Sequence, residues 1–225
     1  MKFGDIFPPF RFRMLKRHFK GGAPKILDVG CASGSPQIAK RAFPRGHYTA
    51  IDMVPPDEDM APYIDRFVQM DAGSLDYSAL ADGDFDIVIL SHVLEHIRNG
   101  EAVLASLLPK VRVGGVVYVE YPSTNSLRLP SAINTLQFCD DPTHIRMYSL
   151  VDIANTLLDG GFKVVDGGIR RDWPRILFFP LAIPNQIVSL LKYGKLNSKG
   201  LWDIAGFAEF AIGIRNEHSG LSTHR

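Results

Sequence analysis

Apolar runs alternate with amphipathic segments along most of the chain. Runs of four to eight apolar residues without polar alternation are typical of strands that are buried on both faces. Alternation of such strands with helices is typical of a parallel, doubly wound α/β sheet. The strands predicted on this basis are 25–29, 48–52, 67–71, 85–91, 116–122, 162–169 and 207–215.

Helix signals fall between these strands. Ser35 is expected to cap a helix over 35–43, with Pro36 in its first turn. A stripe of apolar residues predicts another helix over 103–111. Ser149 and Asp152 have the spacing of a capping box, which predicts a helix that begins directly after Ser149.

Two peripheral segments differ from the rest of the single domain expected over 23–225. Residues 1–22 are basic and aromatic, which suits an anionic membrane surface, RNA, or a short helix packed on the edge of the sheet. Residues 170–204 are apolar and rich in proline, and are expected to form a cap or lid insertion. This cap could cover a hydrophobic acceptor, form a dimer contact or complete the core.

Composition narrows the choice of partners and compartment. The 25 Lys and Arg residues nearly balance the 24 Asp and Glu residues, so nucleic acid is not favoured as a partner. Two cysteines are too few for a disulfide framework, and a cytoplasmic location is expected. No signal peptide and no apolar run long enough to span a bilayer are expected, which leaves peripheral membrane contact open.

The turn after the first predicted strand is the expected binding site, since ligands of parallel sheets lie beyond the carboxyl ends of the strands. Its glycines, Gly30 and Gly34, do not complete the dinucleotide pattern G-x-G-x-x-G, because Ala32 stands between them. No Gly-Lys-Ser/Thr sequence follows, which excludes a P-loop.

Three carboxylates indicate a ligand that is not a phosphate. Asp28 is expected beside the ligand, where it would repel a pyrophosphate and favour an ammonium or a sulfonium. Asp52 ends the second strand and can accept hydrogen bonds from both ribose hydroxyls. Asp71 ends the third strand, where it can accept a hydrogen bond from an adenine amino group beside Ala72. S-adenosylmethionine has all of these groups.

The segments ILDVGCASG, Asp52, MDA (70–72) and FDIVILSHVLEHI together resemble the class I S-adenosylmethionine-dependent methyltransferases, in particular the ubiquinone-type group. The resemblance covers about residues 24–166, and Ala32 departs from it because the family usually has glycine there. It implies a Rossmann-like, three-layer α/β/α fold with a seven-stranded, mostly parallel sheet whose last strand is antiparallel. The cofactor-binding residues expected on this basis are Asp28, Gly30, Cys31, Ala32, Gly34, Asp52, Met53, Asp71, Ala72 and Ser91.

Histidines are the candidates for the chemistry. His92, Glu95 and His96 spell H-x-x-E-H, a zinc-peptidase signature, but the motif follows a buried strand and lacks a clear third ligand. Some ubiquinone-type relatives hold a divalent metal at this place, which the sequence leaves open without favouring it. The candidate bases are His144, His92 and His96, with His144 preferred; His144 could instead order its loop through Asp140 or Asp141.

The resemblance implies transfer of a methyl group from S-adenosylmethionine, with S-adenosylhomocysteine as the product. The fourth strand ends in LSHV and lacks the Asn/Asp-Pro-Pro-aromatic motif of enzymes that methylate amino groups of nucleic-acid bases. A hydroxyl on a small molecule, a glycan or a lipid-linked acceptor is therefore expected. A methyltransferase-like protein that binds cofactor or partner without catalysis, and an NAD(P)-dependent reductase, are the alternatives. The acceptor and the oligomeric state stay open.

Overall fold

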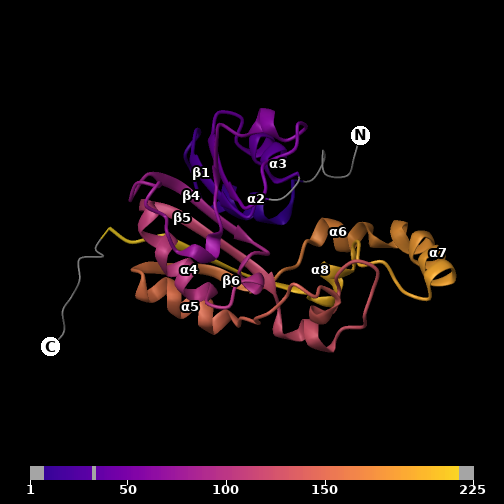
Figure 1. Cartoon of the computed structure of the whole chain (residues 1–225). Coiled ribbons are helices and arrows are strands. Elements are labelled where there is room, and N and C mark those ends of the chain that lie inside the picture. Colours follow the sequence, from indigo (N-terminus) through magenta and orange to yellow (C-terminus); the bar gives the residue numbers. More distant parts are fainter. Residues whose placement is uncertain (1–7, 32–33, 218–225) are drawn as a thin grey trace.

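The fold is built on a seven-stranded sheet with helices on both faces (Figure 1). The computed structural model describes residues 8–31 and 34–217. The strand order is β3-β2-β1-β4-β5-β7-β6. The strands are β1 (Lys25–Val29), β2 (His47–Asp52), β3 (Arg66–Gln69), β4 (Phe85–Ser91), β5 (Val111–Pro122), β6 (Phe162–Ile169) and β7 (Ala208–Arg215).

The direction of the strands places the site. Strands β1 to β5 pair in parallel, and β7 pairs antiparallel with both β5 and β6. The strand order reverses at β1 and β4, because β2 and β3 extend to one side of β1 while β5 follows on the far side of β4. The predicted fold class, including the antiparallel last strand, is confirmed.

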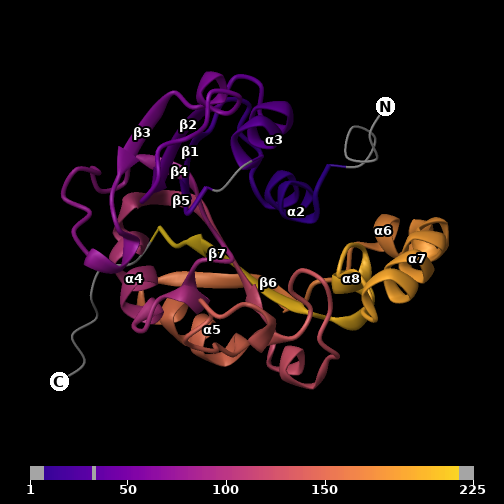
Figure 2. The same ribbon diagram turned by 45° about the vertical axis from the view of Figure 1, so that its right-hand side comes forward.

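Two apolar layers fill the space between the sheet and its helices. Helices α2 (Phe10–His18) and α3 (Ser35–Ala42) cover one face of the sheet (Figure 2). Helices α4 (Gly100–Leu107) and α5 (Leu150–Asp159) cover the other face. Successive residues of β1 serve different layers, since Ile26 belongs to the first and Leu27 to the second. This explains why the strands are apolar throughout.

Element ends differ from the sequence prediction at two strands and two helices. Strand β3 ends at Gln69, before Asp71, and β5 already begins at Val111. Helix α4 ends at Leu107, before the 3₁₀ turn η4 (Leu108–Lys110), because Pro109 cannot donate to a further helical turn; Val111 begins β5 instead. Ser35 does not cap α3. Gly34 is the N-cap, with φ 94°, and the Ser35 hydroxyl donates to Asp28 instead. The capping box of α5 is confirmed.

The N-terminal segment is packed onto the domain where the structure describes it. Phe12 and Leu15 of α2 are fully buried against the sheet. Arg11 donates to the Ser35 hydroxyl at 2.8 Å, and Arg13 forms an ion pair with Asp172 at 2.9 Å. The described part of the segment therefore forms a short helix packed on the sheet, one of the alternatives that the sequence offered, with the exposed residues 20–22 leading into β1. Residues 1–7 lie outside the described chain.

The long connection from β6 to β7 forms helices at one end of the molecule (Figures 1 and 2). It contains α6 (Trp173–Phe178), the 3₁₀ turn η7 (Phe179–Ala182), α7 (Ile183–Tyr193) and α8 (Leu201–Ala205). The stretch Trp173–Tyr193 has 21 residues and contains an 18-residue window with a mean hydropathy of 1.3, enough by length and composition alone to cross a bilayer. This corrects the expectation that the chain has no such run.

Gly30 forms the turn between β1 and the site, and its geometry predicts a specific cost for a side chain. Its φ is +66°, and a Cβ there would lie 2.6 Å from Val93 Cγ2. Gly83 has the same φ but open space around a Cβ. We expect Gly83→Ala to lower the free energy of unfolding by about 1–2 kcal/mol through backbone strain. Gly30→Ala should lower it by roughly 1–3 kcal/mol more, because Val93 must move.

Urea denaturation of the two variants measures this difference. Equal losses in Gly30→Ala and Gly83→Ala would contradict the close packing of the Gly30 turn against Val93.

Candidate functional site

Two cavities open beside the reversal of strand order, and Asp52 lines both. The first, which we call the switch-point cavity, has a volume of about 210 Å³. The second, which we call the loop cavity, has a volume of about 320 Å³. The wall of the switch-point cavity includes Gly30, Asp52, Met53, Asp71, Ala72, His92, Val93, His96 and Ile97.

The carboxyl ends of neighbouring parallel strands bring Asp52 and Asp71 to the same cavity. Val29 is opposite Ile51, and Asp52 is opposite Gln69, so β1, β2 and β3 end at one edge of the sheet. Asp52 Oδ1 accepts a hydrogen bond from the Val54 amide at 3.1 Å. Asp71 Oδ1 accepts one from the Gly73 amide at 2.8 Å and caps the 3₁₀ turn η2 (Ala72–Ser74). Each carboxylate thus holds its own loop in place at the cavity wall.

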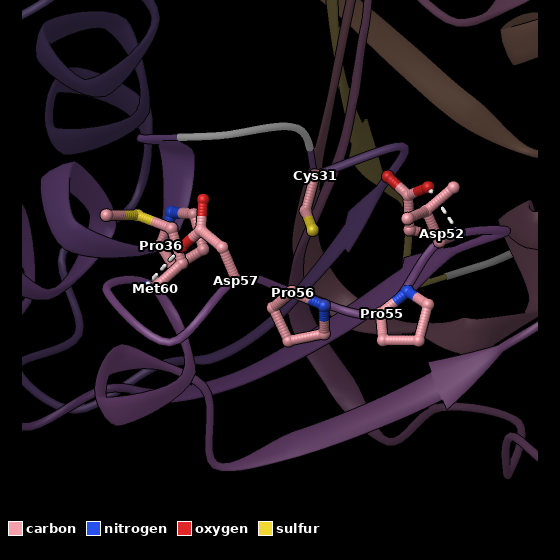
Figure 3. Close-up of a pocket in the computed structure, with 8 residues that line it drawn as sticks. Cys31, Pro36, Asp52, Pro55, Pro56, Asp57 and Met60 are labelled. Atoms are coloured by element: carbon pink, nitrogen blue, oxygen red, sulfur yellow. Dashed lines mark hydrogen bonds between the residues drawn. The ribbon is translucent and has the colours of Figure 1, made fainter.

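The loop cavity lies between the end of β1 and the loop after β2 (Figure 3). Cys31, Pro56 and Asp57 line it, with Met60 at one end and Asp52 at the other. Burial, and then the nearby carboxylates, raise the pKa of the Cys31 thiol to about 12. Cys31 is therefore a neutral wall residue, not a nucleophile.

Asp28 does not line either cavity, which corrects the expectation that its carboxylate faces the ligand. The residue is only 1% exposed, and burial raises the pKa of its side chain. Its Oδ2 accepts hydrogen bonds from the Ser35 and Tyr48 hydroxyls, both at 2.5 Å. Asp28 therefore supports the loop from behind.

The remaining expected cofactor residues divide into those at the cavities and those elsewhere. Gly30, Asp52, Met53, Asp71 and Ala72 meet at the switch-point cavity, while Cys31 lines the loop cavity. Gly34 and Ser91 lie close in sequence to the wall but do not line either cavity. Ala32 lies outside the described residues.

His92 is held between two carboxylates, which corrects its assignment as a possible base. Its Nδ1 lies 3.0 Å from Glu95 Oε1, and its Nε2 lies 3.0 Å from Glu120 Oε1. Burial alone would lower the pKa of His92, but the hydrogen bonds to Glu120 and Glu95 raise it to about 9. Both nitrogens therefore donate protons at neutral pH, and neither can accept one from a substrate.

Glu120 and Arg170 complete this buried cluster. Arg170 Nη1 lies 2.9 Å from Glu120 Oε1, and its Nε lies 2.9 Å from Asp203 Oδ1. Burial would raise the pKa of Glu120, but the charges of Arg170 and His92 hold it well below its ordinary value. Neither residue was expected at the site from the sequence. The only signal was a charged residue, Glu120, inside an otherwise apolar strand.

His96 is the histidine at the cavity whose ring is free to accept a proton. Its Nδ1 lies 2.9 Å from Thr143 Oγ1 and 3.2 Å from the Thr143 carbonyl oxygen, so Nδ1 carries the proton and Nε2 has the lone pair. The Thr143 hydroxyl donates in turn to Asp141 Oδ1 at 2.5 Å. This arrangement orients the His96 ring as a base is oriented by a partner.

His144 lies behind His96 and does not line either cavity. The two rings are 4.9 Å apart, and His144 Nδ1 lies 2.7 Å from the Phe138 carbonyl oxygen. Its Nε2 is 3.8 Å from Asp141 Oδ2, which fits the alternative that His144 orders its loop through Asp141. The geometry favours His96 over the preferred His144 as the base.

The comparisons with known proteins agree with this geometry. A family model described as "Methyltransferase domain" matches residues 8–166. The chain belongs to this family. The predicted resemblance to class I S-adenosylmethionine-dependent methyltransferases is therefore confirmed.

The relatives of this methyltransferase-family chain are similar over part of their length. It is 35% identical over 101 residues to "Methyltransferase str3" of Strobilurus tenacellus, covering 44% of this chain and 36% of that protein. It is 33% identical over 122 residues to the "Ubiquinone biosynthesis O-methyltransferase" of Azotobacter vinelandii, covering 49% of each. The chain thus spans about half the length or less of these two relatives.

A solved structure with the same fold is an S-adenosylmethionine-dependent methyltransferase from Archaeoglobus fulgidus. The TM-score is 0.57 at 20% identity, and the match covers 90% of both chains. At this identity the likeness shows the fold alone.

The methyltransferase domain also has a group of residues that fits a divalent metal. One ligand atom each from Glu95, His96 and His144 lies within 4.8 Å of the others. Within the described chain, Glu95 Oε2 is buried without a hydrogen-bond partner. The Phe138 and Thr143 carbonyls fix protons on the Nδ1 atoms of His144 and His96, which leaves both Nε2 lone pairs for a metal. The zinc-peptidase geometry is not formed, because His92, with φ +57°, precedes the 3₁₀ turn η3 (Leu94–His96) and faces Glu120.

The raised pKa of His92 predicts how stability depends on pH. The folded protein holds this proton up to about pH 9, whereas an unfolded histidine releases it near pH 6.5. The stabilisation is therefore fully present below about pH 6.5 and is lost as the pH rises towards 9. We expect the free energy of unfolding, measured by urea denaturation with a chelator present, to fall across this range.

His92→Gln should remove most of this slope, and His47→Gln, a change at an exposed histidine, should keep it. A slope that is the same in all three proteins would contradict the charged state of His92.

Proposed function

We propose that this protein transfers the methyl group of S-adenosylmethionine to a hydroxyl oxygen on a small-molecule, glycan or lipid-linked acceptor. The observation that carries the proposal is the meeting of Asp52, Asp71 and the Gly30 turn at one cavity beside the reversal of strand order. Ligands of parallel sheets bind at this place.

The cavity wall has a partner for each part of the adenosyl group. In our proposal the two ribose hydroxyls donate to Asp52, which ends β2 at the cavity. The adenine amino group donates to Asp71, and Ala72 and Ile97 supply apolar contacts to the ring. The left-handed Gly30 lets the backbone approach the methionine part, where a side chain would collide with Val93.

The proposed chemistry is an in-line displacement. The acceptor oxygen attacks the methyl carbon, the carbon–sulfur bond breaks with its electron pair going to sulfur, and S-adenosylhomocysteine leaves. His96 Nε2 takes the hydroxyl proton, with Thr143 and Asp141 holding the ring in orientation. The sulfur becomes a neutral thioether, and the positive charge of the sulfonium ends as the proton on His96.

A hydroxyl acceptor is supported by two observations. The curated relative from Azotobacter vinelandii is named an O-methyltransferase, and His96 supplies the base that a hydroxyl needs. A metal held by Glu95, His96 and His144, if bound, would occupy the His96 Nε2 lone pair and would supply a Lewis acid for an acceptor oxygen in place of that base.

Removal of the Asp52 carboxylate should weaken cofactor binding. We expect Asp52→Ala to raise the Kd for S-adenosylhomocysteine by about tenfold to a hundredfold, since two charge-assisted hydrogen bonds are lost. Isothermal calorimetry measures the change, with Asp59→Ala in the exposed neighbouring loop as the matched control. NADPH should not bind. Binding of NADPH in place of S-adenosylhomocysteine would favour the reductase, and undiminished binding by Asp52→Ala would remove the ribose assignment.

Removal of the proposed base should slow turnover without changing cofactor affinity. We expect His96→Gln to lower kcat by about 10²–10⁴-fold. Thr143→Val should lower it less and shift its pH profile, because Thr143 only positions the ring. The assay is methyl transfer from labelled S-adenosylmethionine to catechol-type and polyol acceptors, with and without a chelator.

Full activity of His96→Gln in the presence of a chelator would rule out His96 as the base. Activity that the chelator alone abolishes would show that the histidines act as metal ligands. Cofactor binding without transfer to any acceptor would favour the non-catalytic alternative.

A further inference from the structure

The segment from α6 to α7, Trp173–Tyr193, has its apolar side chains on the outside. Leu181 is 77% exposed and Leu191 is 82% exposed. Further exposed apolar residues of the segment are Trp173, Leu177, Ile183, Ile187, Val188, Leu190 and Tyr193. Such a concentration of exposed apolar side chains is typical of a surface that meets a partner or a membrane.

The buried face of α7 is polar, whereas a helix on the surface of a water-soluble domain normally buries its apolar face. Gln186 and Ser189 are the buried residues of this helix. Gln186 Nε2 donates to the Asn197 carbonyl at 2.9 Å, and the Ser189 hydroxyl donates to the Lys195 carbonyl at 2.8 Å. These bonds fasten the helix to the following loop by its polar face. Because these hydrogen bonds hold the polar face of α7 against the protein, the apolar face of the helix points outward.

Residues 173–202, which include the segment and the loop after it, carry a net positive charge. They contain no Asp or Glu; Arg175 forms an ion pair with the preceding Asp172 at 3.3 Å, and Lys192, Lys195 and Lys199 supply the remaining charge. Trp173 and Tyr193 stand at the two ends of the segment. Aromatic residues at the ends and basic residues beside an apolar face are typical of helices that lie at the surface of an anionic membrane.

We propose that the α6–α7 segment docks this protein on an anionic lipid bilayer, with the apolar face lying in the headgroup region. The charge favours a lipid partner over a second copy of the chain, because two copies would bring six lysine charges together, and the one acidic residue beside the segment, Asp172, already pairs with Arg13 and Arg175. The segment lies along the surface rather than across it, since α6, η7 and α7 are separate elements, each with a proline (Pro174, Pro180 and Pro184) as its second residue.

The docking segment lies at the same edge of the sheet as the two cavities. Ile169, at the end of β6, pairs with Glu209, and Ala208, at the start of β7, pairs with Pro122 at the end of β5. The connection from β6 to β7 therefore starts and ends at the carboxyl edge of β1 to β5. A bilayer bound there faces the cavity edge of the protein, and this docking does not depend on methyl transfer.

Vesicle binding by the full chain tests the proposal. We expect co-sedimentation with vesicles of phosphatidylcholine and phosphatidylglycerol at 7:3, and at least about fivefold weaker binding to phosphatidylcholine alone. Leu177→Gln/Leu191→Gln should weaken binding by at least about tenfold. Val151→Gln/Leu158→Gln, a matched change at two exposed apolar residues of α5, should leave binding unchanged.

The same preparation allows two further measurements. Lys192→Gln should weaken binding about fivefold, whereas Lys163→Gln on the exposed side of β6 should have no effect. Brominated lipids should quench the fluorescence of the wild-type protein, and Trp173→Phe should lose this quenching. The quenching is measured on the wild-type protein, so it tests the docking even if a variant does not fold.

Three results would overturn the proposal: no binding to the anionic vesicles, equal loss of binding in the α6–α7 and α5 variants, or a dimer in sedimentation equilibrium that Leu177→Gln/Leu191→Gln dissociates. Calorimetry with S-adenosylhomocysteine is a separate measurement, so failure of docking and failure of the proposed function can be told apart.

Discussion

The buried carboxylate of Glu120 connects the parts of the structure that form the site. It lies at the end of β5 and accepts hydrogen bonds from Tyr118, His92 and Arg170. His92 belongs to the turn after β4, and Arg170 follows β6 and also binds Asp203 of α8. An unpaired carboxylate at this depth would be costly, so the three donors are required together. The wall of the switch-point cavity and the base of the β6–β7 connection are thereby held to one strand.

The hydrogen bonds of His92 to the buried carboxylates explain the unusual backbone conformation at the site. His92 has φ +57°, a conformation that is uncommon for a residue other than glycine. Two carboxylates bind its two ring nitrogens and hold it there. Glu95 binds His92 through Oε1, its Oε2 is buried without a hydrogen-bond partner, and its carboxylate belongs to the group with His96 and His144 that fits a metal. The charged contacts that hold the turn at His92 therefore lie next to His96, the proposed base.

The sequence predicted what depends on local pattern. Strands β4 and β6 have the predicted bounds, and Asp52, Asp71 and Gly30 meet because parallel strands end at one edge. Contacts between distant residues could not be read in this way: His96 meets Thr143, 47 positions away, and Glu120 meets Arg170, 50 positions away. The burial of Asp28 depended on the Tyr48 and Ser35 hydroxyls, and the outward apolar face of α7 depended on bonds from Gln186. Periodicity shows that a helix has two faces, but not which one the protein covers.

The switch-point cavity is the proposed site of the methyl donor. A crystal structure of the protein with S-adenosylhomocysteine tests this most directly. We predict the ribose hydroxyls on the Asp52 carboxylate, the adenine ring beside Asp71 and Ala72, and the homocysteine part against the Gly30 turn. A ligand bound away from this cavity, or a ribose without contact to Asp52, would contradict the account.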